Sequence, residues 1–409
     1  RKDVLKSYGA GIVFPHHEQW EAIAGFYGTA FAPSPSYRRS RVRPYLEKGL
    51  NFMFYGDMGL EPDRNADIGP FMHELARHPI GRTYTGLAYD MADKPTQDYY
   101  VWGWKKTIDY YGINSVHMDN TIRGRWVNKN IFTGHGWYDD GGTLRGRWAI
   151  FGAREAAKRF RWLHHVYIKN GVVSLHAGAR HIPPISGFAD MHQGGEGGFY
   201  MHGDIARELI LPEEWEDGYQ YRFGVPVEIL TKRGRQDWGP NFLYMYVMLF
   251  DMDIRNFGAF YHPSYWHVNP NRPDVRTMGD YDPYFAQVGI SEQSTPQVLW
   301  WQLKDEFGTR EAEFMPFWDN GDVLKVSGNE KLRSSFYLHP GKAALFVLAN
   351  VDPEPAEAVM ELDLAALGLE DKTLHAYDAF TDAPYTMDGS RISLEIPGAT
   401  YRLIRLEER

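Results

Sequence analysis

The sequence predicts an α/β fold: a (β/α)8 barrel followed by a small antiparallel β-sandwich. Two observations predict it. Short β-rich runs alternate with longer helical patterns through most of the chain, which is the pattern of parallel βαβ units. After about residue 319 the β runs follow one another directly and are separated by turns, which is typical of a sandwich. The expected domains are therefore a barrel over residues 1–318 and a β-sandwich over residues 319–409.

The predicted barrel contains eight candidate strands, and helical patterns lie between most of them. Eight such units within about 260 residues fit a closed barrel. The candidate strands cover residues 11–14, 51–55, 83–89, 115–119, 172–177, 187–190, 227–230 and 257–261.

Two helices of the barrel are well marked. The first has Asp98 as a candidate cap and ends before Gly112. The second is expected over about residues 148–169, and Asn170-Gly171 then stops it. Apolar residues recur every three or four positions in both, at Val101, Trp104, Ile108 and Tyr111 and at Ala153, Ala156, Phe160, Leu163 and Tyr167.

The tail contains seven short β runs, over residues 323–327, 334–338, 343–348, 358–362, 374–378, 392–396 and 400–406. Two long connections, 121–147 and 191–225, interrupt the barrel pattern. Both are rich in Gly, Trp and Tyr, so we expect ordered walls beside a binding site instead of disordered loops.

Composition excludes several classes of function. The net charge is −9 and there is no long basic stretch, which disfavours nucleic acid as a partner. There is no apolar run long enough to span a membrane, and the absence of Cys excludes disulfides and thiolate chemistry. No cofactor is expected. An exported bacterial location, periplasmic or secreted, is expected, although no signal peptide is visible in the chain.

The most informative single residue is Asp119, which ends the predicted strand 115–119. Catalytic groups of barrel enzymes lie at the carboxyl-terminal ends of the strands. Alternate residues of a strand share one face, so His117 is expected directly beneath Asp119. The simpler interpretation is that Asp119 only caps the turn after the strand.

A second pair of carboxylates lies in residues 187–198, which read GFADMHQGGEGG. Asp190 is expected at the end of the sixth strand, and Glu196 is flanked by glycines that let the backbone approach a ligand. Hydrolysis of a glycosidic bond needs two carboxyl groups on either side of that bond. Asp119 with Glu196 or Asp190 is therefore the predicted catalytic pair of a retaining hydrolysis, with Asp119 as the nucleophile and Glu196, slightly favoured, or Asp190 as the acid/base. The competing interpretation is a glycine-rich turn with a solvated Glu196.

Further polar and aromatic residues fall near the predicted strand ends and are expected to bind the substrate. Tyr and Trp rings stack on sugar faces, and 15% of the residues are aromatic, so a carbohydrate is the expected partner. Arginines in and near residues 121–147 leave a carboxylated or sulfated sugar open as the substrate, and the simpler interpretation is that they are solvated loop charges. The predicted substrate-binding residues are Asp57, Tyr89, Asp90, His117, Arg123, His176, Arg180, His192 and Tyr261.

The chain resembles barrel-type glycoside hydrolases in residues 89–119 and in the β-rich tail that begins near Val323. The resemblance implies an Asp nucleophile at the fourth strand end, which is Asp119 here. In the α-galactosidase-like clan it implies a general acid after the sixth strand, the predicted place of Asp190. The chain is also similar to family 123-like hydrolases, some of which use an adjacent Asp-Glu pair, but Asn120 follows Asp119 here.

Two other functions stay open from the residues alone. His117, Asp119, His176, Asp190 and His192 are metal-ligand types, so a metal-dependent deacetylase or amidase is one alternative. A non-catalytic glycan-binding protein is another. The acidic stretch Asp139-Asp140-Gly141-Gly142 lacks the spacing of a calcium loop and is predicted to be a plain turn.

Overall fold

The structure is a computed structural model. It describes residues 12–13, 38–57, 71, 74, 92–119, 127–176, 182–194, 224–231, 240–256 and 296–408. The chain divides into two compact units, Arg1–Gly194 with Tyr221–Glu228, and Gly195–Gln220 with Ile229–Arg409. The predicted domain border after residue 318 falls inside the second unit.

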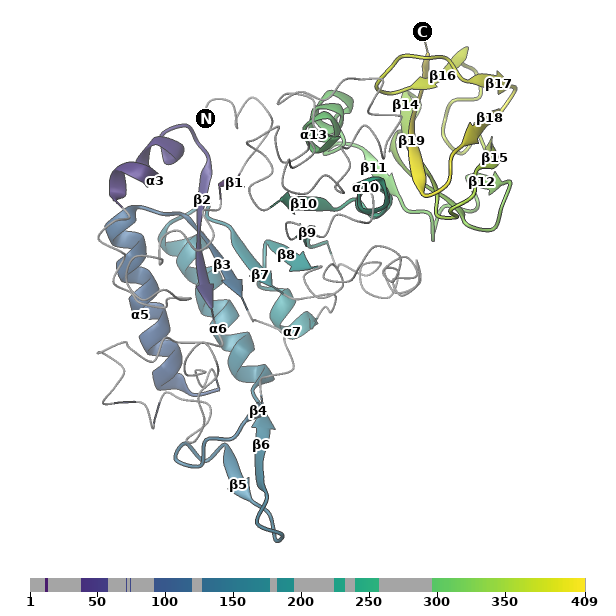
Figure 1. Cartoon of the computed structure of the whole chain (residues 1–409). Coiled ribbons are helices and arrows are strands. Elements are labelled where there is room, and N and C mark those ends of the chain that lie inside the picture. The colour runs from purple at the N-terminus through teal and green to yellow at the C-terminus, as the bar shows by residue number, and fades with distance from the viewer. Residues whose placement is uncertain are drawn as a thin grey trace, which may run out of the picture. The chain divides into compact units, whose positions relative to one another are not determined.

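The first unit contains a parallel sheet (Figure 1). Its strands are β1 (Ile12–Val13), β2 (Asn51–Asp57), β3 (Ser115–Asp119), β7 (Val173–His176), β8 (Met191–Gly194) and the start of β9 (Val227–Thr231), adjacent in that order. Parallel strands need a crossover between them. Helices provide it here: α5 (Lys94–Tyr111) lies between β2 and β3 in the chain, and α6 (Ile150–Trp162) lies between β3 and β7.

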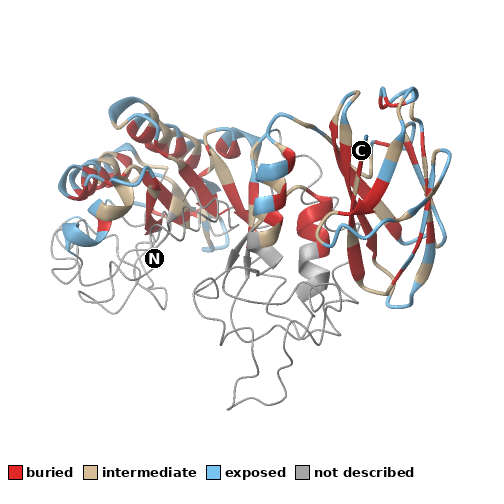
Figure 2. Cartoon of the chain, turned by 90° about the horizontal axis from the view of Figure 1, so that it is seen from above, coloured by how far each residue is buried: buried red, intermediate tan, exposed pale blue. Residues whose placement is uncertain are grey.

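One face of this sheet is apolar and packs on the helices. Phe54 and Met118 of the strands share a buried cluster with Trp104 of α5 and Phe160 of α6. The short helices α3 (Arg39–Leu46) and α7 (Pro183–Ser186) each add a side chain to this core, Val42 and Ile185. Figure 2 shows the resulting buried layer between strands and helices.

Both predicted helices of this unit are confirmed, with corrections at their ends. Asp93, not Asp98, precedes α5, and Gly112 ends that helix in the left-handed conformation (φ 69°) that glycine adopts without strain. The second helix continues from α6 into a π-helical turn, η3 (Leu163–Tyr167). Tyr167 is largely exposed, so it does not belong to the predicted apolar face.

Two strand predictions need correction. β2 pairs directly with β3, with Tyr55 opposite His117 and Asp57 opposite Asp119, so no strand lies between them. Asp119 therefore ends the third strand of the described sheet, not the fourth. Residues 187–190 form a turn after α7, and the strand begins at Met191. The predicted strands 83–89 and 257–261 lie outside the described residues.

Part of the long connection after β3 is ordered, as its composition predicts. Residues 127–148 form a three-stranded antiparallel sheet of β4 (Val127–Asn128), β6 (Leu144–Trp148) and β5 (Gly136–Tyr138), with β6 in the middle. We call residues 127–148 the arm. Asp139–Gly142 is its plain turn, because Asp139 accepts backbone hydrogen bonds from Gly141 and Thr143.

The second unit contains an antiparallel β-sandwich and three elements that precede it. These are α10 (Pro240–Leu249), β10 (Asp253–Asn256) and α13 (Pro296–Phe307). One sheet orders β11 (Glu313–Met315), β13 (Leu332–His339), β14 (Ala343–Asn350), β19 (Thr400–Glu408) and β16 (Leu374–Asp378). The other orders β12 (Leu324–Ser327), β15 (Ala356–Leu362), β18 (Arg391–Ile396) and β17 (Thr386–Asp388).

All seven predicted β runs of the tail are therefore strands, and the structure adds β11 and β17. One apolar core joins the two sheets, with Phe336 and Phe346 on one side and Met360 and Ile392 on the other. In β18, Ile392, Leu394 and Ile396 are buried and the residues between them are exposed. This alternation is the pattern in the sequence that predicts the strand.

Phe346→Ala is expected to destabilise the sandwich by about 3–5 kcal/mol. Phe346 is fully buried and its ring lies 5.0 Å from the Phe336 ring, so truncation leaves a cavity between the sheets. Hydrogen exchange at the amides of β13, β14 and β19 measures the effect within this unit. Lys325→Ala, at an exposed position of β12, is the control and should change stability by less than about 0.5 kcal/mol. A change below about 1 kcal/mol for Phe346→Ala would contradict this account.

Within the described residues, no helix is both long enough and apolar enough to cross a membrane.

Candidate active site

Asp119 ends β3 on the polar face of the parallel sheet, the face opposite the helices. Because Tyr55 lies opposite His117 in the register, and His117 lies opposite Ser174, all three share the face of Asp119. Tyr55, His117 and Ser174 are buried. The prediction that His117 lies beneath Asp119 is confirmed. This face carries hydroxyl and imidazole groups where the other face carries Phe54, Val116 and Leu175.

Two hydrogen bonds hold the Asp119 carboxylate. The Tyr55 hydroxyl donates to Oδ2, and Nδ1 of His176 bonds to Oδ1. His176 is buried, whereas the Asp119 side chain keeps 18% of its surface exposed. The carboxylate is therefore held by Tyr55 from the layer below and by His176 at its own level, and it stays partly exposed.

The same contacts keep Asp119 ionised. Burial alone would raise the pKa of Asp119. The hydrogen bond and charge of His176, the charge of His117 and the hydrogen bond of Tyr55 outweigh burial and hold this pKa below its ordinary value. Asp119 therefore carries a negative charge at neutral and mildly acidic pH, which suits a nucleophile or an electrostatic stabiliser and not a proton donor.

His117 supports this arrangement from one layer below. Its Nδ1 lies 2.9 Å from Oγ of Ser174. The His117 ring lies 5.8 Å from the ring of Tyr55 and 6.2 Å from the ring of His176. Packed between both hydrogen-bond partners of Asp119, His117 restricts how their side chains can move. Tyr55 and Ser174 were not among the predicted site residues.

The row that begins at Asp119 continues across the next strands. Met118 lies opposite Leu175, which sets Asp119 level with His176, and His176 lies opposite Gln193 of β8. The backbone N–H of His192 donates to Pro226 O at 2.8 Å. From this bond we infer a regular parallel ladder in which His192 lies opposite Val227, and hence Gln193 lies opposite Glu228 of β9.

Glu228 is thus a second carboxylate at the level of Asp119 and on the same face of the sheet. It was not predicted as a site residue. Its neighbours Val227 and Ile229 are buried, and one carboxylate oxygen of Glu228 is buried as well. The sequence could have indicated Glu228, because it is an acidic residue inside the otherwise apolar predicted strand 227–230. Neighbouring residues of a strand point to opposite faces, so Glu228 points away from the face that Val227 and Ile229 share.

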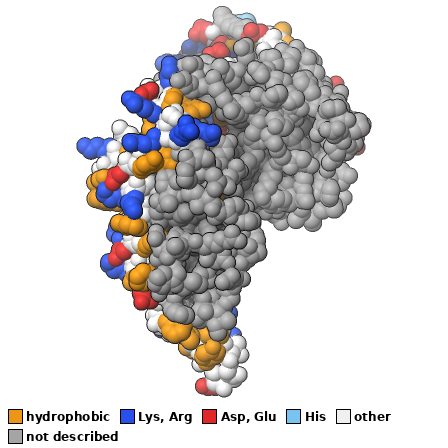
Figure 3. All heavy atoms as spheres, turned by 60° about the vertical axis from the view of Figure 1, so that its left-hand side comes forward, with side chains coloured by type: hydrophobic (Ala, Val, Ile, Leu, Met, Phe, Trp, Pro, Cys, Tyr) orange, Lys and Arg blue, Asp and Glu red, His pale blue; other side chains and the backbone are white. Residues whose placement is uncertain are grey.

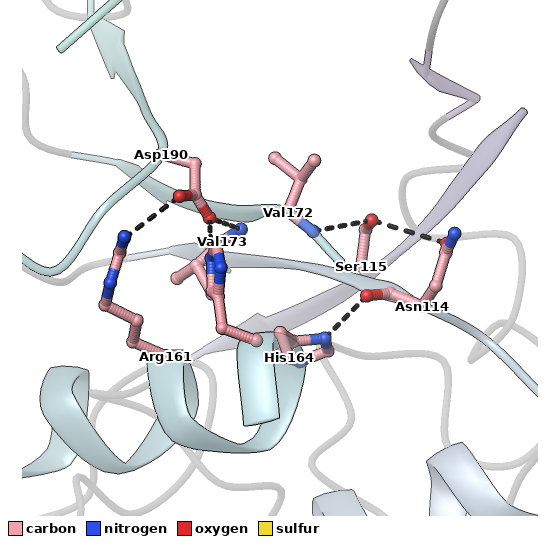
Figure 4. A network of polar contacts seen from close by, with 8 residues as sticks. Asn114, Ser115, Arg161, His164, Val172, Val173 and Asp190 are labelled. Carbon is pink, nitrogen blue, oxygen red and sulfur yellow. Dashed lines mark hydrogen bonds and ion pairs between the residues drawn. The ribbon is translucent and has the colours of Figure 1, made fainter. Parts of the chain in front are cut away.

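Asp190 lies elsewhere, which corrects its predicted position after the sixth strand. It precedes β8, at the amino-terminal edge of the sheet, whereas Asp119 lies at the carboxyl-terminal edge. Asp190 pairs with Arg161 at 2.9 Å and with His165 at 2.7 Å, and it accepts the Val173 amide at 2.8 Å (Figure 4). These contacts connect α6, η3, β7 and the start of β8, so Asp190 has a structural role.

His164 belongs to the same amino-terminal region (Figure 4). It is fully buried, and its Nδ1 donates to Asn114 O at 2.7 Å. Burial, the largest influence, lowers the pKa of His164 to about 4. His164 is therefore neutral in the folded protein at pH values where an unfolded chain would already protonate it.

Acidification should for this reason destabilise the protein through His164. Between pH 6.5 and about 4 the unfolded state binds one more proton than the folded state, so the free energy of unfolding falls as pH falls. From pH 7 to pH 5 the His164 contribution is about 2 kcal/mol. In urea unfolding between pH 7 and pH 5, the free energy of unfolding of His164→Gln should fall by about 2 kcal/mol less than that of the wild type. His375→Gln, in β16 and exposed, is the control. Equal losses in wild type and His164→Gln would contradict the prediction.

The remaining predicted residues divide into two groups. His192 is described and lies on the helix side of β8, with Nε2 3.4 Å from Ser186 O, so it does not share the face of Asp119. Asp57 lies opposite Asp119 in the backbone register. The others lie outside the described residues: Tyr89, Asp90, Arg123, Arg180, Glu196 and Tyr261.

His, Asp and Glu are also the residue types that bind metal ions. In the described parts of the chain, no three His, Asp or Glu side chains are grouped so as to hold a metal ion. Nδ1 of His176 and Nδ1 of His117 instead make the hydrogen bonds to Asp119 and Ser174.

Comparison with solved structures bears on the fold. The chain is similar to a maltogenic α-amylase from Thermotoga neapolitana, with 12% identity, a TM-score of 0.63, and coverage of 100% of this chain and 93% of the other. It is also similar to a family 27 β-L-arabinopyranosidase from Geobacillus stearothermophilus, with 11% identity, a TM-score of 0.59, and coverage of 99% and 90%.

A third similar structure is a putative α-N-acetylgalactosaminidase from Bacillus halodurans, with 11% identity, a TM-score of 0.55, and coverage of 100% and 91%. No family model matches the chain, and no curated protein matches it. At these identities the likeness concerns the fold alone. At that level, the predicted resemblance to barrel-type glycoside hydrolases with a C-terminal domain is confirmed.

Proposed function

We propose that the protein is a glycoside hydrolase that cleaves a glycosidic bond of an oligo- or polysaccharide, and that its parallel sheet closes into a (β/α)8 barrel. The observation that carries the proposal is the setting of Asp119. Its carboxylate stands at the carboxyl-terminal edge of the sheet, where barrel enzymes place catalytic groups, and two buried side chains keep it ionised.

An ionised carboxylate in this setting suits the chemistry of glycosidic bond cleavage. The transition state carries positive charge on the anomeric carbon and ring oxygen. Asp119 would stabilise that charge or attack the anomeric carbon directly. Tyr55 and His176 would fix its orientation, so that little reorganisation is needed as the charge develops.

The reaction also needs a proton donor for the leaving oxygen, and Glu228 is the carboxyl group that the described residues favour. It lies three strands from Asp119, about 14 Å along the sheet. Side chains on the inner face of a closed barrel converge, so a sugar bound between the two would contact both. Glu196, predicted as the donor from its glycine-rich surroundings, lies outside the described residues. The contacts of Asp190 at the other edge argue against Asp190 in this role.

The likeness to three barrel glycosidases supports the same class of activity. The three enzymes are named for different sugars, so the likeness supports hydrolysis of glycosides and leaves the sugar to experiment. The hydrogen bonds of His117 and His176 to Ser174 and Asp119 favour a carboxylate mechanism over the metal-dependent deacetylase or amidase.

The test is turnover of a panel of nitrophenyl glycosides of both anomeric configurations by the purified protein, with and without chelator. Hydrolysis of at least one glycoside that persists in chelator is the expected result. Proton NMR of the anomer first released then decides between retention, which we propose and which needs carboxyl groups about 5–5.5 Å apart, and inversion, which needs about 6.5–9.5 Å. The proposal would be overturned if no glycoside were turned over. It would also be overturned if the purified protein held a stoichiometric metal ion and lost its activity when chelator removed that ion.

A further inference from the structure

The arm, residues 127–148, leaves the parallel sheet after Asp119 and returns to the chain just before α6. In a βαβ unit the segment between a strand and its following helix lies at the carboxyl-terminal edge of the sheet. The arm therefore stands at the edge where Asp119 ends, and Figure 1 shows it extending away from the ends of β2 and β3.

Local polar contacts hold the arm in one conformation. Asn128 and Asn130 are fully buried, and their side-chain oxygens accept the amides of Asn130 and Phe132, each at 2.8 Å. At the tip, Asp139 accepts the Thr143 amide at 2.8 Å. A side chain at Gly146 would place Cβ 2.2 Å from Asn128 O, so that the close approach of β4 requires glycine. The arm is a built structure and not a loose loop.

The aromatic side chains of the arm nevertheless face outward. Phe132 and Trp148 are each 63% exposed, Tyr138 is 56% exposed and Trp137 is 46% exposed. Hydrophobic side chains are visible over the arm at the bottom of Figure 3. A rigid element that displays four rings without burying them gains little stability from them, and such exposed apolar groups mark binding surfaces.

Two arginines flank one of these rings. Trp137 lies opposite Arg145 in the β5–β6 ladder, and Arg147, two residues along β6, is on the same face. The Arg145 Nε donates to Asp139 at 2.7 Å, which orients its guanidinium. Arg147 is exposed, and none of the ion pairs found among the described residues includes it. We call Trp137, Arg145 and Arg147 the arm face.

We propose that the arm face binds an acidic glycan, with Trp137 stacking on a sugar ring and Arg147 and Arg145 pairing with carboxylate or sulfate groups. The inference rests on the proposed function. If the sheet edge at Asp119 cleaves a polysaccharide, the arm face would bind a further part of the same chain. Aromatic rings stack on the C–H faces of sugars, and guanidinium groups bind carboxylate and sulfate in a bidentate way. Positive charge on the arm face is what selects an acidic chain over a neutral one.

The experiment measures binding in the full-length Asp119→Asn variant, which prevents turnover. Affinity electrophoresis uses two matched pairs of polymers: polygalacturonate with its methyl ester, and dextran sulfate with dextran. We expect one acidic polymer to bind at least tenfold more tightly than its neutral partner. That binding should weaken at least fivefold on Trp137→Ala and on Arg147→Ala. Trp162→Ala, an exposed ring on α6, is the matched control and should change nothing.

Tighter binding of polygalacturonate than of its methyl ester identifies carboxylate as the bound group. Tighter binding of dextran sulfate than of dextran identifies sulfate. Equal binding of acidic and neutral polymers, no binding of any polymer, or binding unchanged by both arm variants would overturn the inference. So would sedimentation showing that the arm face joins two copies of the chain, with a dimer that Trp137→Ala dissociates. Failure here is distinct from failure of the proposed function, which shows as no hydrolysis of any small glycoside by the wild type.

Discussion

Asp119→Asn is expected to lower kcat for glycoside hydrolysis by at least about 10⁴-fold, while the protein stays folded and still binds its substrate. The asparagine keeps the shape of the side chain and can still accept one hydrogen bond. It lacks the negative charge that Tyr55 and His176 hold in place. Kinetics on the best nitrophenyl glycoside, with a thermal melt and calorimetric binding on the same sample, measure the effect.

Asp109→Asn is the matched control for this variant. Asp109 is an exposed carboxylate of α5 that pairs with Lys105 at 2.6 Å, so the same chemical change there should alter kcat by less than about twofold. A fall of less than tenfold for Asp119→Asn would show that the charge at the strand end is not catalytic. The protein would then have to use another carboxylate, or be a glycan-binding protein without activity.

Glu228→Gln is expected to lower hydrolysis by about 10²–10⁴-fold for substrates with poor leaving groups. If Glu228 gives the proton to the leaving oxygen, its loss matters little for a substrate whose leaving group departs as an unprotonated phenolate. Alkyl glycosides should therefore lose most of their rate, and dinitrophenyl glycosides should lose much less. The measurement is kcat/KM across a series of leaving groups of the same sugar, for the wild type and the variant.

The control for this series is Glu357→Gln, at an exposed position in β15 of the sandwich, which should leave all rates unchanged. Should Glu228→Gln lose less than threefold on alkyl glycosides, Glu228 is not the donor. Glu196→Gln then becomes the variant to measure in the same series. An equal loss on every leaving group would place Glu228 in binding or charge stabilisation and not in proton transfer.

The sandwich and several strands of the parallel sheet could be predicted because their patterns are local. The period-two burial of β18 and the turns around it are present in consecutive residues. The same holds for α5, whose buried residues recur every three or four positions before Gly112. In these segments the solvent-facing and core-facing positions alternate with the period of the backbone, so composition alone reveals the conformation.

The segment before Asp190 shows where such patterns fail. Residues 187–189 are short and mostly apolar, which fits a buried strand or a packed turn equally well. Local hydrogen bonds from Gly187 to Pro183 and from Ala189 to Ser186 make it a turn that continues α7. This difference of a few residues moves Asp190 from one edge of the sheet to the other. It becomes the partner of Arg161 and His165.

The sequence by itself determined that an acidic residue ends a buried strand, with His117 beneath it, in a chain with a β-sandwich tail. Only the tertiary structure decided which groups meet that residue. Tyr55, His176 and Glu228 come from strands that lie 64, 57 and 109 residues away in the chain, and pairing register alone sets them level with Asp119 or one layer below it. Register depends on backbone hydrogen bonds between distant segments, and no local pattern in the sequence records it.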